Sequence, residues 1–281
     1  MKVERKCKIV SKEWLNRDAV YMVLEVGDMV RTSCKGPGQF VHVKCGDGLL
    51  LRRPISVCSC MEGEPEDTLA IVFEVRGEGT QWLADRVKGE SVDVLGMLGN
   101  GFTMKHDGRY LLVGGGIGVP PMLGCVREAV KQGAKPTAIL GFRSKGAVIL
   151  EGDFRDECET FVTTDDGSYA RHGFVTDVLK EQISSASGVA ACGPKPMLKA
   201  IAAIAKEAGV PCQVSMEERM GCGIGACLAH HFGNHLAAIK HLCIHVCLPG
   251  PNLVHRKPTP CNLSAPTGAR WEPGVASCSR P

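Results

Sequence analysis

Aromatic residues make up only 5% of this 281-residue sequence, and its basic residues form no cluster. The scarcity of Phe, Trp and Tyr argues against a protein that stacks nucleic-acid bases on aromatic rings. The net charge is +3, and no run of Lys or Arg offers a surface to a phosphate backbone. We therefore expect no nucleic-acid partner.

Long apolar segments are also missing from the N-terminus, whose first residues, MKVERKCKIVSKEW, are charged. We therefore expect neither a signal peptide nor a membrane span. The fifteen cysteines are scattered through apolar stretches, as at Cys7, Cys45, Cys125 and Cys192. Such a distribution is typical of buried free thiols and not of a secreted disulfide scaffold, so we expect a cytoplasmic, reducing compartment.

The chain changes its pattern near residue 101. Before that point, short stretches rich in β-branched residues are bounded by Gly, Pro or Asp, which predicts an antiparallel β-barrel. From about residue 109, apolar strands alternate with helical segments, which predicts a parallel α/β sheet. The expected domains are a barrel over 1–101, an α/β domain over 102–209 and a small module over 210–281.

The pattern breaks again at His230. The last 52 residues hold six of the nine histidines and seven of the sixteen prolines, but only one of the 30 acidic residues, Glu272. No helical or strand period is sustained there. The shift marks either a different module or sequence that was not selected to fold.

Three segments have the composition of phosphate-binding sites. The glycines of LLVGGGIGVPPM (111–122) stand between a strand and a helix, where backbone N–H groups can approach a phosphate. In LLLRRPISVCS (49–59), an Arg beside Pro54 can present a guanidinium, and Ser56 shares the face of that proline. VRGEGTQWL (75–83) offers another anion site with Thr80 as the N-cap of a helix. The alternatives are a tight turn, a surface Arg pair and a plain helix start.

Two further segments place cysteines where chemistry is performed. Cys192, in AACGPKPML, follows a predicted strand at the carboxyl edge of the sheet, where α/β folds bind ligands, although a lone Cys is more often inert core. Cys222-x4-Cys227-x2-His230 has the ligand spacing of a plant-type [2Fe–2S] site, with His230 in place of the third Cys. Zinc is the alternative metal, but the interleaved glycines suit it less well.

In this order, the motifs resemble those of the electron-transfer subunits of two-component, NAD-dependent dihydroorotate dehydrogenases, a branch of the ferredoxin reductase superfamily. The resemblance runs from about residue 5 to Ala229 and rests on these segments: RRPIS (52–56), GEGT (77–80), LGMLGNGF (95–102), GGGIGVPP (114–121), TTDDGS (163–168), ACGPKPML (191–198) and EERMGCGIGACLA (217–229).

The resemblance implies a flavin-binding β-barrel, a Rossmann-like NAD domain and a C-terminal [2Fe–2S] module. NADH would reduce FAD, and the cluster would pass electrons singly to FMN in a separate dihydroorotate-oxidising subunit, in a heterotetramer of two copies of each chain that serves pyrimidine biosynthesis. No membrane partner is implied. The residues to which these roles carry over are, for FAD, Arg53, Pro54, Ile55, Ser56, Gly79 and Thr80; for NAD(H), Gly115, Gly116, Gly118, Cys192 and Gly193, with Cys192 also as the catalytic candidate; and, for the cluster, Cys222, Cys227, His230 and Cys247.

His230 is the main departure from the family pattern, which expects a third Cys there and a fourth Cys before a Gly-Pro turn. Cys247 precedes Gly250-Pro251 and is the best fourth ligand, with Cys243 as runner-up. His230 either ligates iron, or begins a frame-shifted tail, or marks a lost cluster. The loss of acidic residues at the same point favours the frame shift.

Three functions follow from these alternatives. The first is the dihydroorotate dehydrogenase subunit, and the second is an electron-bifurcating or hydrogenase-linked reductase subunit of the same superfamily. The third is a flavin-binding interaction subunit without electron output.

Overall fold

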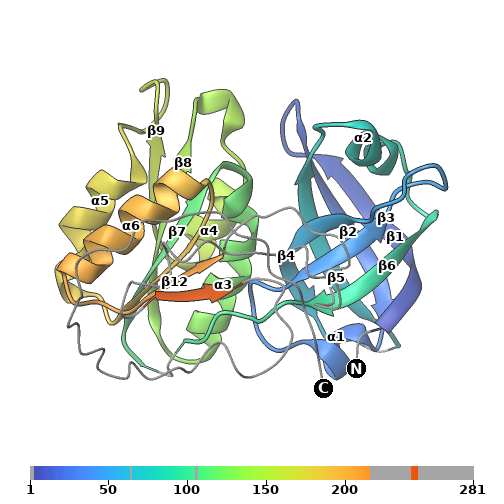
Figure 1. Ribbon diagram of the computed structural model, residues 1–281, viewed down its shortest axis with the longest axis horizontal. Helices are drawn as coiled ribbons and strands as arrows, with labels where there is room; N and C mark the ends of the chain where they lie inside the picture. The colour runs from blue at the N-terminus through green and yellow to red at the C-terminus, as the bar shows by residue number, and fades with distance from the viewer. Residues whose placement is uncertain (1–2, 64, 105–106, 216–241, 246–281) are drawn as a thin grey trace, which may run out of the picture. The chain divides into compact units, whose positions relative to one another are not determined.

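The computed structural model describes residues 3–63, 65–104, 107–215 and 242–245, the last of these by their backbone alone. They form a β-barrel followed by an α/β sheet (Figure 1). No helix in this part of the chain combines the length and the apolar character needed to cross a membrane.

The N-terminal half closes into a barrel whose strands follow the order β1-β2-β5-β4-β3-β6, with antiparallel pairing throughout and β6 returning to β1. Alternate residues of β2 and β5 point into a core of aliphatic side chains and thiols, which include Cys7 and Cys45. The predicted antiparallel barrel is confirmed. The barrel elements are β1 (Val3–Trp14), β2 (Ala19–Gly27), α1 (Met29–Ser33), β3 (Phe40–Lys44), β4 (Arg53–Met61), β5 (Asp67–Glu74), α2 (Glu78–Ala84) and β6 (Ser91–Leu98).

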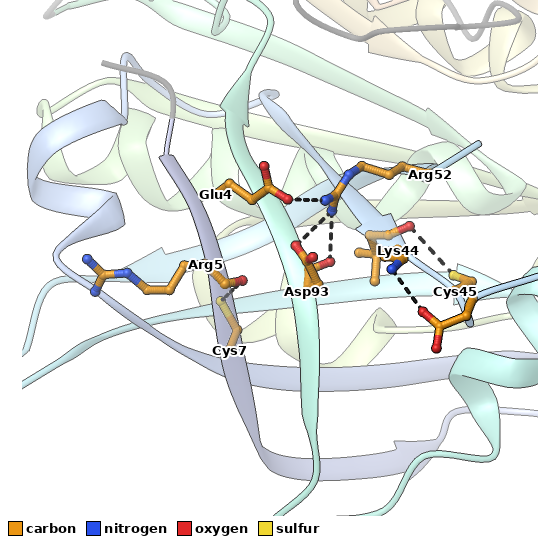
Figure 2. A network of polar contacts seen from close by, with 9 residues as sticks. Glu4, Arg5, Cys7, Lys44, Cys45, Arg52 and Asp93 are labelled. Carbon is orange, nitrogen blue, oxygen red and sulfur yellow. Dashed lines mark hydrogen bonds and ion pairs between the residues drawn. The ribbon is translucent and has the colours of Figure 1, made fainter. Parts of the chain in front are cut away.

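Arg52 links two strands of this barrel through ion pairs. Its guanidinium lies between Glu4 on β1, at 2.5 Å, and Asp93 on β6, at 2.9 Å (Figure 2). It also donates to the Asp93 carbonyl at 3.2 Å. The side chain is only 19% exposed, and both of its terminal nitrogens have carboxylate partners. The first arginine of the RRPIS segment therefore joins strands of the barrel.

Asp67, at the start of β5, is the most deeply buried ion-pair member that the structure describes. Its carboxylate accepts hydrogen bonds from the Arg31 backbone N–H at 3.0 Å and from the Gly63 backbone N–H at 3.3 Å. It also pairs with Arg31 Nε at 3.0 Å, and its side chain is 0% exposed. These contacts tie the short helix α1 and the loop before β5 to the barrel.

Asp67→Asn should lower the free energy of unfolding by about 2 kcal/mol, because it weakens several hydrogen bonds to a buried charged group and removes the negative charge beside Arg31. Urea unfolding followed by circular dichroism measures this loss. Asp47→Asn is the matched control: Asp47 is 98% exposed beside Lys44, and its loss should cost under about 0.5 kcal/mol. Equal effects of the two substitutions would contradict the structural role of Asp67.

The second half is a parallel sheet in the order β10-β9-β8-β7-β11-β12-β13. The predicted α/β sheet is confirmed. The linker between β6 and β7 contains the predicted boundary at residues 101 and 102, and the division into domains itself stays a prediction. The remaining elements are β7 (Arg109–Gly115), η1 (Gly116–Gly118), α3 (Val119–Lys131), β8 (Lys135–Phe142), η2 (Lys145–Ala147), α4 (Glu151–Glu157), β9 (Glu159–Thr164), β10 (Arg171–His172), α5 (Val175–Gln182), η3 (Ile183–Ser185), β11 (Gly188–Cys192), α6 (Lys195–Glu207), β12 (Cys212–Ser215) and β13 (Leu242–His245).

Helices cover both faces of this sheet, because residues of a strand alternate between its two sides. Leu111 and Val113 of β7 pack with α5 and α6 on one face. Leu112 packs with α3 and α4 on the other face. The central strands β7 and β11 are thus buried on both sides, and their carboxyl ends lie next to each other in the parallel pairing of Gly114 with Cys192.

Candidate functional sites at two glycine-lined loops

Arg53 and Gly79 make the first site, at the point where β4 begins and α2 follows β5. The Gly79 backbone lies so close to Arg53 that an added Cβ would stand 2.5 Å from Arg53 Nε and 3.0 Å from its guanidinium carbon. Arg53 is half-buried and donates to the Leu51 carbonyl at 2.6 Å. No carboxylate among the described residues pairs with it, in contrast to Arg52.

Thr80 shapes the turn that leads into α2, the helix that contains Gly79. Its hydroxyl accepts the backbone N–H groups of Arg76 at 2.9 Å and of Gly77 at 3.2 Å, and it donates to the Gly77 carbonyl at 3.0 Å. The prediction that Thr80 is the N-cap was wrong, since α2 begins at Glu78 and Gly77 is its N-cap. The extended backbone of Gly77 lets the helix start earlier, so that Thr80 reaches back from the third helical position.

The three residues after Arg53 alternate along β4 as expected. Pro54 is exposed and Ser56 is half-buried, while Ile55 between them is 5% exposed and packs in the barrel core. Pro54 and Ser56 therefore share one face of the strand, on the side away from Ile55. Their contact with a flavin stays a prediction.

The second site is the turn from β7 through η1 into α3. Gly116 adopts a left-handed backbone with φ of 53°, and a Cβ placed on it would meet no atom within 4 Å. Pro120 and Pro121 follow in the first turn of α3 and have no N–H groups. Backbone donors for a phosphate at this turn must therefore come from the residues of the turn before Pro120, three of which, Gly115, Gly116 and Gly118, are glycines.

Gly118 brings this turn against the end of β11. A Cβ at Gly118 would overlap the carbonyl oxygen of Cys192 and would stand 2.7 Å from the Gly193 nitrogen. Gly115 is less restricted, because a Cβ there would lie 2.5 Å from the sulfur of Met197, at the flexible end of that side chain. The structure thus brings together Gly115, Gly118, Cys192 and Gly193, as the motifs predicted. Met197 is a packing residue that the sequence did not single out, although it lies within the ACGPKPML segment.

The thiols differ in their surroundings. Cys7, Cys45 and Cys125 are buried, as predicted, and burial raises the pKa of Cys7 to about 12 and that of Cys45 to about 11. Cys192, which was expected to be buried with them, is only half-buried. The difference arises because Cys192 is the last residue of β11, at the edge of the sheet, where side chains lose one layer of packing.

The predicted cluster ligands Cys222, Cys227, His230 and Cys247 lie outside the described residues. Cys243 lies in β13, whose backbone pairs with β12 in parallel register opposite Gln213. The C-terminal segment therefore contributes a short strand to the sheet.

Comparisons with known proteins show what this chain is similar to. No family model matches the chain. The chain is 42% identical over 257 residues to the dihydroorotate dehydrogenase B (NAD(+)) electron transfer subunit of Geobacillus kaustophilus, covering 89% of this chain and 96% of the relative. It is 45% identical over 215 residues to the subunit of the same description from Geobacillus sp. (strain WCH70), covering 75% and 82%.

Solved structures show the same fold. An NADH-dependent reduced ferredoxin-NADP oxidoreductase, studied for flavin-based electron bifurcation, aligns with a TM-score of 0.71 and 28% identity over 79% of each chain. The ferredoxin reductase of carbazole 1,9a-dioxygenase aligns with a TM-score of 0.63 at 19% identity, over 75% of this chain and 67% of that one. The shared fold and the identity over nearly the whole length of the relatives lead to one conclusion: this chain belongs to the family of dihydroorotate dehydrogenase B (NAD(+)) electron transfer subunits.

Proposed function

We propose that this protein passes electrons between NAD(H), FAD and a [2Fe–2S] cluster, to or from the FMN of a dihydroorotate dehydrogenase catalytic subunit in pyrimidine biosynthesis. The observation that carries the proposal is the pair of glycine-lined loops. One lies beside Arg53, which has no carboxylate partner in the part of the chain that the structure describes, and the other lies at the end of β7. Each lies in a motif of the family to which the chain belongs.

The first loop fits the pyrophosphate of FAD. Arg53 is held by the Leu51 carbonyl, and its remaining N–H groups are available to phosphate oxygens in the bidentate geometry that guanidinium favours. Gly79 allows this guanidinium to lie against the backbone of α2, which a larger residue would prevent. Pro54 and Ser56 then present the adjoining face of β4 to the rest of the cofactor.

The second loop fits the phosphates of NAD(H). The open, left-handed Gly116 leaves room for a phosphate, and the glycine N–H groups supply donors that Pro120 and Pro121 cannot. Cys192 and Gly193 adjoin the same turn through their close approach to Gly118. We assign them to the nicotinamide end, where they fix its position at the sheet edge.

Flavin, when bound, accepts two electrons as a hydride and can release them one at a time, which a nicotinamide cannot do. The role of this chain is therefore to hold the two cofactors in position. The barrel residues orient one cofactor and the turn after β7 orients the other.

Cys222, Cys227, His230 and Cys247 would hold the cluster, with Cys243 as the other candidate for the fourth ligand. The match to the Geobacillus kaustophilus subunit covers 89% of this chain, which is more than the 229 residues that end at Ala229. The matched segment therefore includes part of the C-terminal tail, and this supports a tail related to the family. A frame shift after Ala229 stays the competing proposal, and translation of the other reading frames of the gene tests it.

The partner would be the FMN-containing catalytic subunit, in an assembly of two copies of each chain. The relatives' description as electron transfer subunits supports a separate catalytic partner. The stoichiometry and the cytoplasmic location stay predictions of the sequence.

A related reductase role is the second candidate function. The alignment with the bifurcating NADH-dependent oxidoreductase at a TM-score of 0.71 favours it over an interaction subunit. Co-purification separates the candidates, since only the first requires a dihydroorotate-oxidising subunit to be retained with this chain.

The absorbance spectrum of the purified protein tests the cofactor assignment. We expect flavin bands together with broad absorption at longer wavelengths than flavin absorbs. Cys222→Ser should remove the broad component and leave the flavin bands, because a serine hydroxyl replaces a thiolate ligand. Cys60→Ser, which alters a cysteine of the barrel, is the control and should leave both. A wild-type spectrum of flavin alone would support the subunit without a cluster.

A further inference from the structure

Gly124, in the middle of α3, lies where this helix packs against strand β4 of the barrel. A Cβ placed on Gly124 would stand 2.8 Å from the carbonyl oxygen of Cys58 and 3.7 Å from the Cβ of Pro37. The contact with Cys58 is with its backbone, which cannot rotate away as the end of a side chain can. The barrel and the sheet belong to one compact unit of the chain, and this contact is one of those that join them.

The pairing of β4 with β5 fits this close approach. Val57 pairs with Ile71 and Ser59 pairs with Ala70, so Cys58 is an extra residue in β4, as in a β-bulge. A bulge interrupts the ladder of hydrogen bonds and bends the strand locally. The helix therefore contacts β4 where the strand departs from its regular path.

The surroundings of the contact are apolar and buried. Cys58, Ala70 and Val72 of the barrel belong to the same buried cluster as Leu123 and Val126 of α3. Each of these side chains is at most 4% exposed. Because protein interiors are close-packed, a change in volume of even one methylene displaces the neighbouring groups. The position of α3 on β4 is thus defined by packing on both elements.

Helix α3 and strand β4 each connect this contact directly to a proposed cofactor site. α3 begins at Val119, directly after the turn assigned to the phosphates of NAD(H), and Gly124 lies about 8 Å along the helix from that start. Ser56, on the face of β4 assigned to FAD, lies two residues before Cys58, or about 7 Å along the strand. A movement of α3 relative to β4 therefore moves one cofactor site relative to the other.

We propose that Gly124 is a positioning residue for hydride transfer: because it has no side chain, α3 lies on the backbone of β4 at the separation that brings the nicotinamide to the flavin. The inference rests on the proposed function and adds to it the contact that fixes the two sites to each other. The reaction concerned converts NADH, FAD and one proton from solvent into NAD⁺ and FADH₂, with one C–H bond broken at the nicotinamide and one N–H bond formed at the flavin. Such a transfer needs reacting atoms about 3–3.5 Å apart, so its rate depends on the position of α3.

Gly124→Ala tests the proposal. For the new methyl group to reach an ordinary contact distance, α3 and β4 must separate by about 0.6 Å. The rate constant of FAD reduction at saturating NADH should fall about 10-fold, while the dissociation constants of FAD and NAD⁺ should change by less than about 2-fold, because each site stays intact on its own element. Anaerobic stopped-flow measurement of flavin bleaching gives the rate. Titration of the apoprotein with FAD, and of the FAD-loaded protein with NAD⁺, gives the affinities.

Gly152→Ala is the matched control. It makes the same change in helix α4, where the methyl group meets no atom within 4 Å, and it should leave the rate and both affinities unchanged. Since alanine favours a helix over glycine by about 1 kcal/mol, neither variant should lose its helix. A crystal structure of Gly124→Ala provides a readout independent of activity and should show α3 displaced from Cys58.

Four results would each overturn the proposal. They are an unchanged rate in Gly124→Ala, a loss of FAD or NAD⁺ affinity as large as the loss of rate, an unfolded variant, and an α3 that keeps its wild-type distance from Cys58. The proposed function fails by a different result, a wild-type flavin that NADH does not reduce. In that case the crystal structure of Gly124→Ala still decides whether Gly124 sets the position of α3.

Discussion

Arg53→Ala is expected to weaken FAD binding by about 10- to 100-fold, because it removes charge-assisted hydrogen bonds to the pyrophosphate worth about 1.5–3 kcal/mol. The half-buried guanidinium lies against Gly79 and has no carboxylate partner among the described residues, and we propose that phosphate oxygens are its acceptors. Flavin content after gel filtration, and titration of the apoprotein with FAD followed by flavin fluorescence, measure the change.

Arg76→Ala is the matched control for this substitution. Arg76 lies in the same loop as Gly79, but its guanidinium is exposed and paired with Glu74. Its removal leaves the backbone N–H that donates to Thr80 and should change FAD affinity by less than about 3-fold. If Arg53→Ala kept wild-type FAD affinity, or if both variants lost it equally, the assignment of the first loop would be wrong.

Gly118→Ala is expected to lower the rate of FAD reduction by NADH by about 100-fold while FAD stays bound. The new methyl group would overlap the Cys192 carbonyl, so the turn after β7 and the end of β11 must move apart. A displacement of about 1 Å in a positioning element can cost about two orders of magnitude in rate. Anaerobic stopped-flow measurement of flavin bleaching reports the rate.

Two further glycine variants distinguish a specific effect on the proposed NAD(H) site from a general loss of folding. Gly152→Ala, in the first turn of α4, meets no atom within 4 Å and should leave the rate unchanged. Gly116→Ala also has open space, and its left-handed backbone costs only about 1–2 kcal/mol, but its methyl group would occupy the place assigned to a phosphate. Wild-type rates in both Gly116→Ala and Gly118→Ala would contradict the second site.

The sequence predicted the elements whose signal is local. Alternating β-branched residues marked the barrel, and the glycines after an apolar strand marked the turn at β7. The family resemblance implied that Gly118 and Cys192 belong to one NAD(H) site, and the structure places the two residues next to each other. The motif order, and not any single motif, made these assignments specific.

Long-range contacts could not be predicted in this way. Nothing near Arg52 in the sequence shows that Glu4 and Asp93 would pair with its guanidinium. The start of α2 after Gly77 depends on backbone conformation. Thr80 was therefore predicted to be the N-cap, although it is the third residue of the helix. Asp67 and Arg31 are likewise a pair that only the folded barrel brings together.

The central claim is that this chain connects dihydroorotate oxidation to the nicotinamide pool, and a reconstitution tests it most directly. The FAD-loaded chain is mixed anaerobically with an FMN-containing dihydroorotate dehydrogenase catalytic subunit, dihydroorotate and NAD⁺, and NADH formation is followed by its absorbance. The proposed function predicts NADH formation that requires both chains and is lost with Arg53→Ala. Absence of NADH formation from a complex that retains its flavins and still bleaches with added NADH would contradict it.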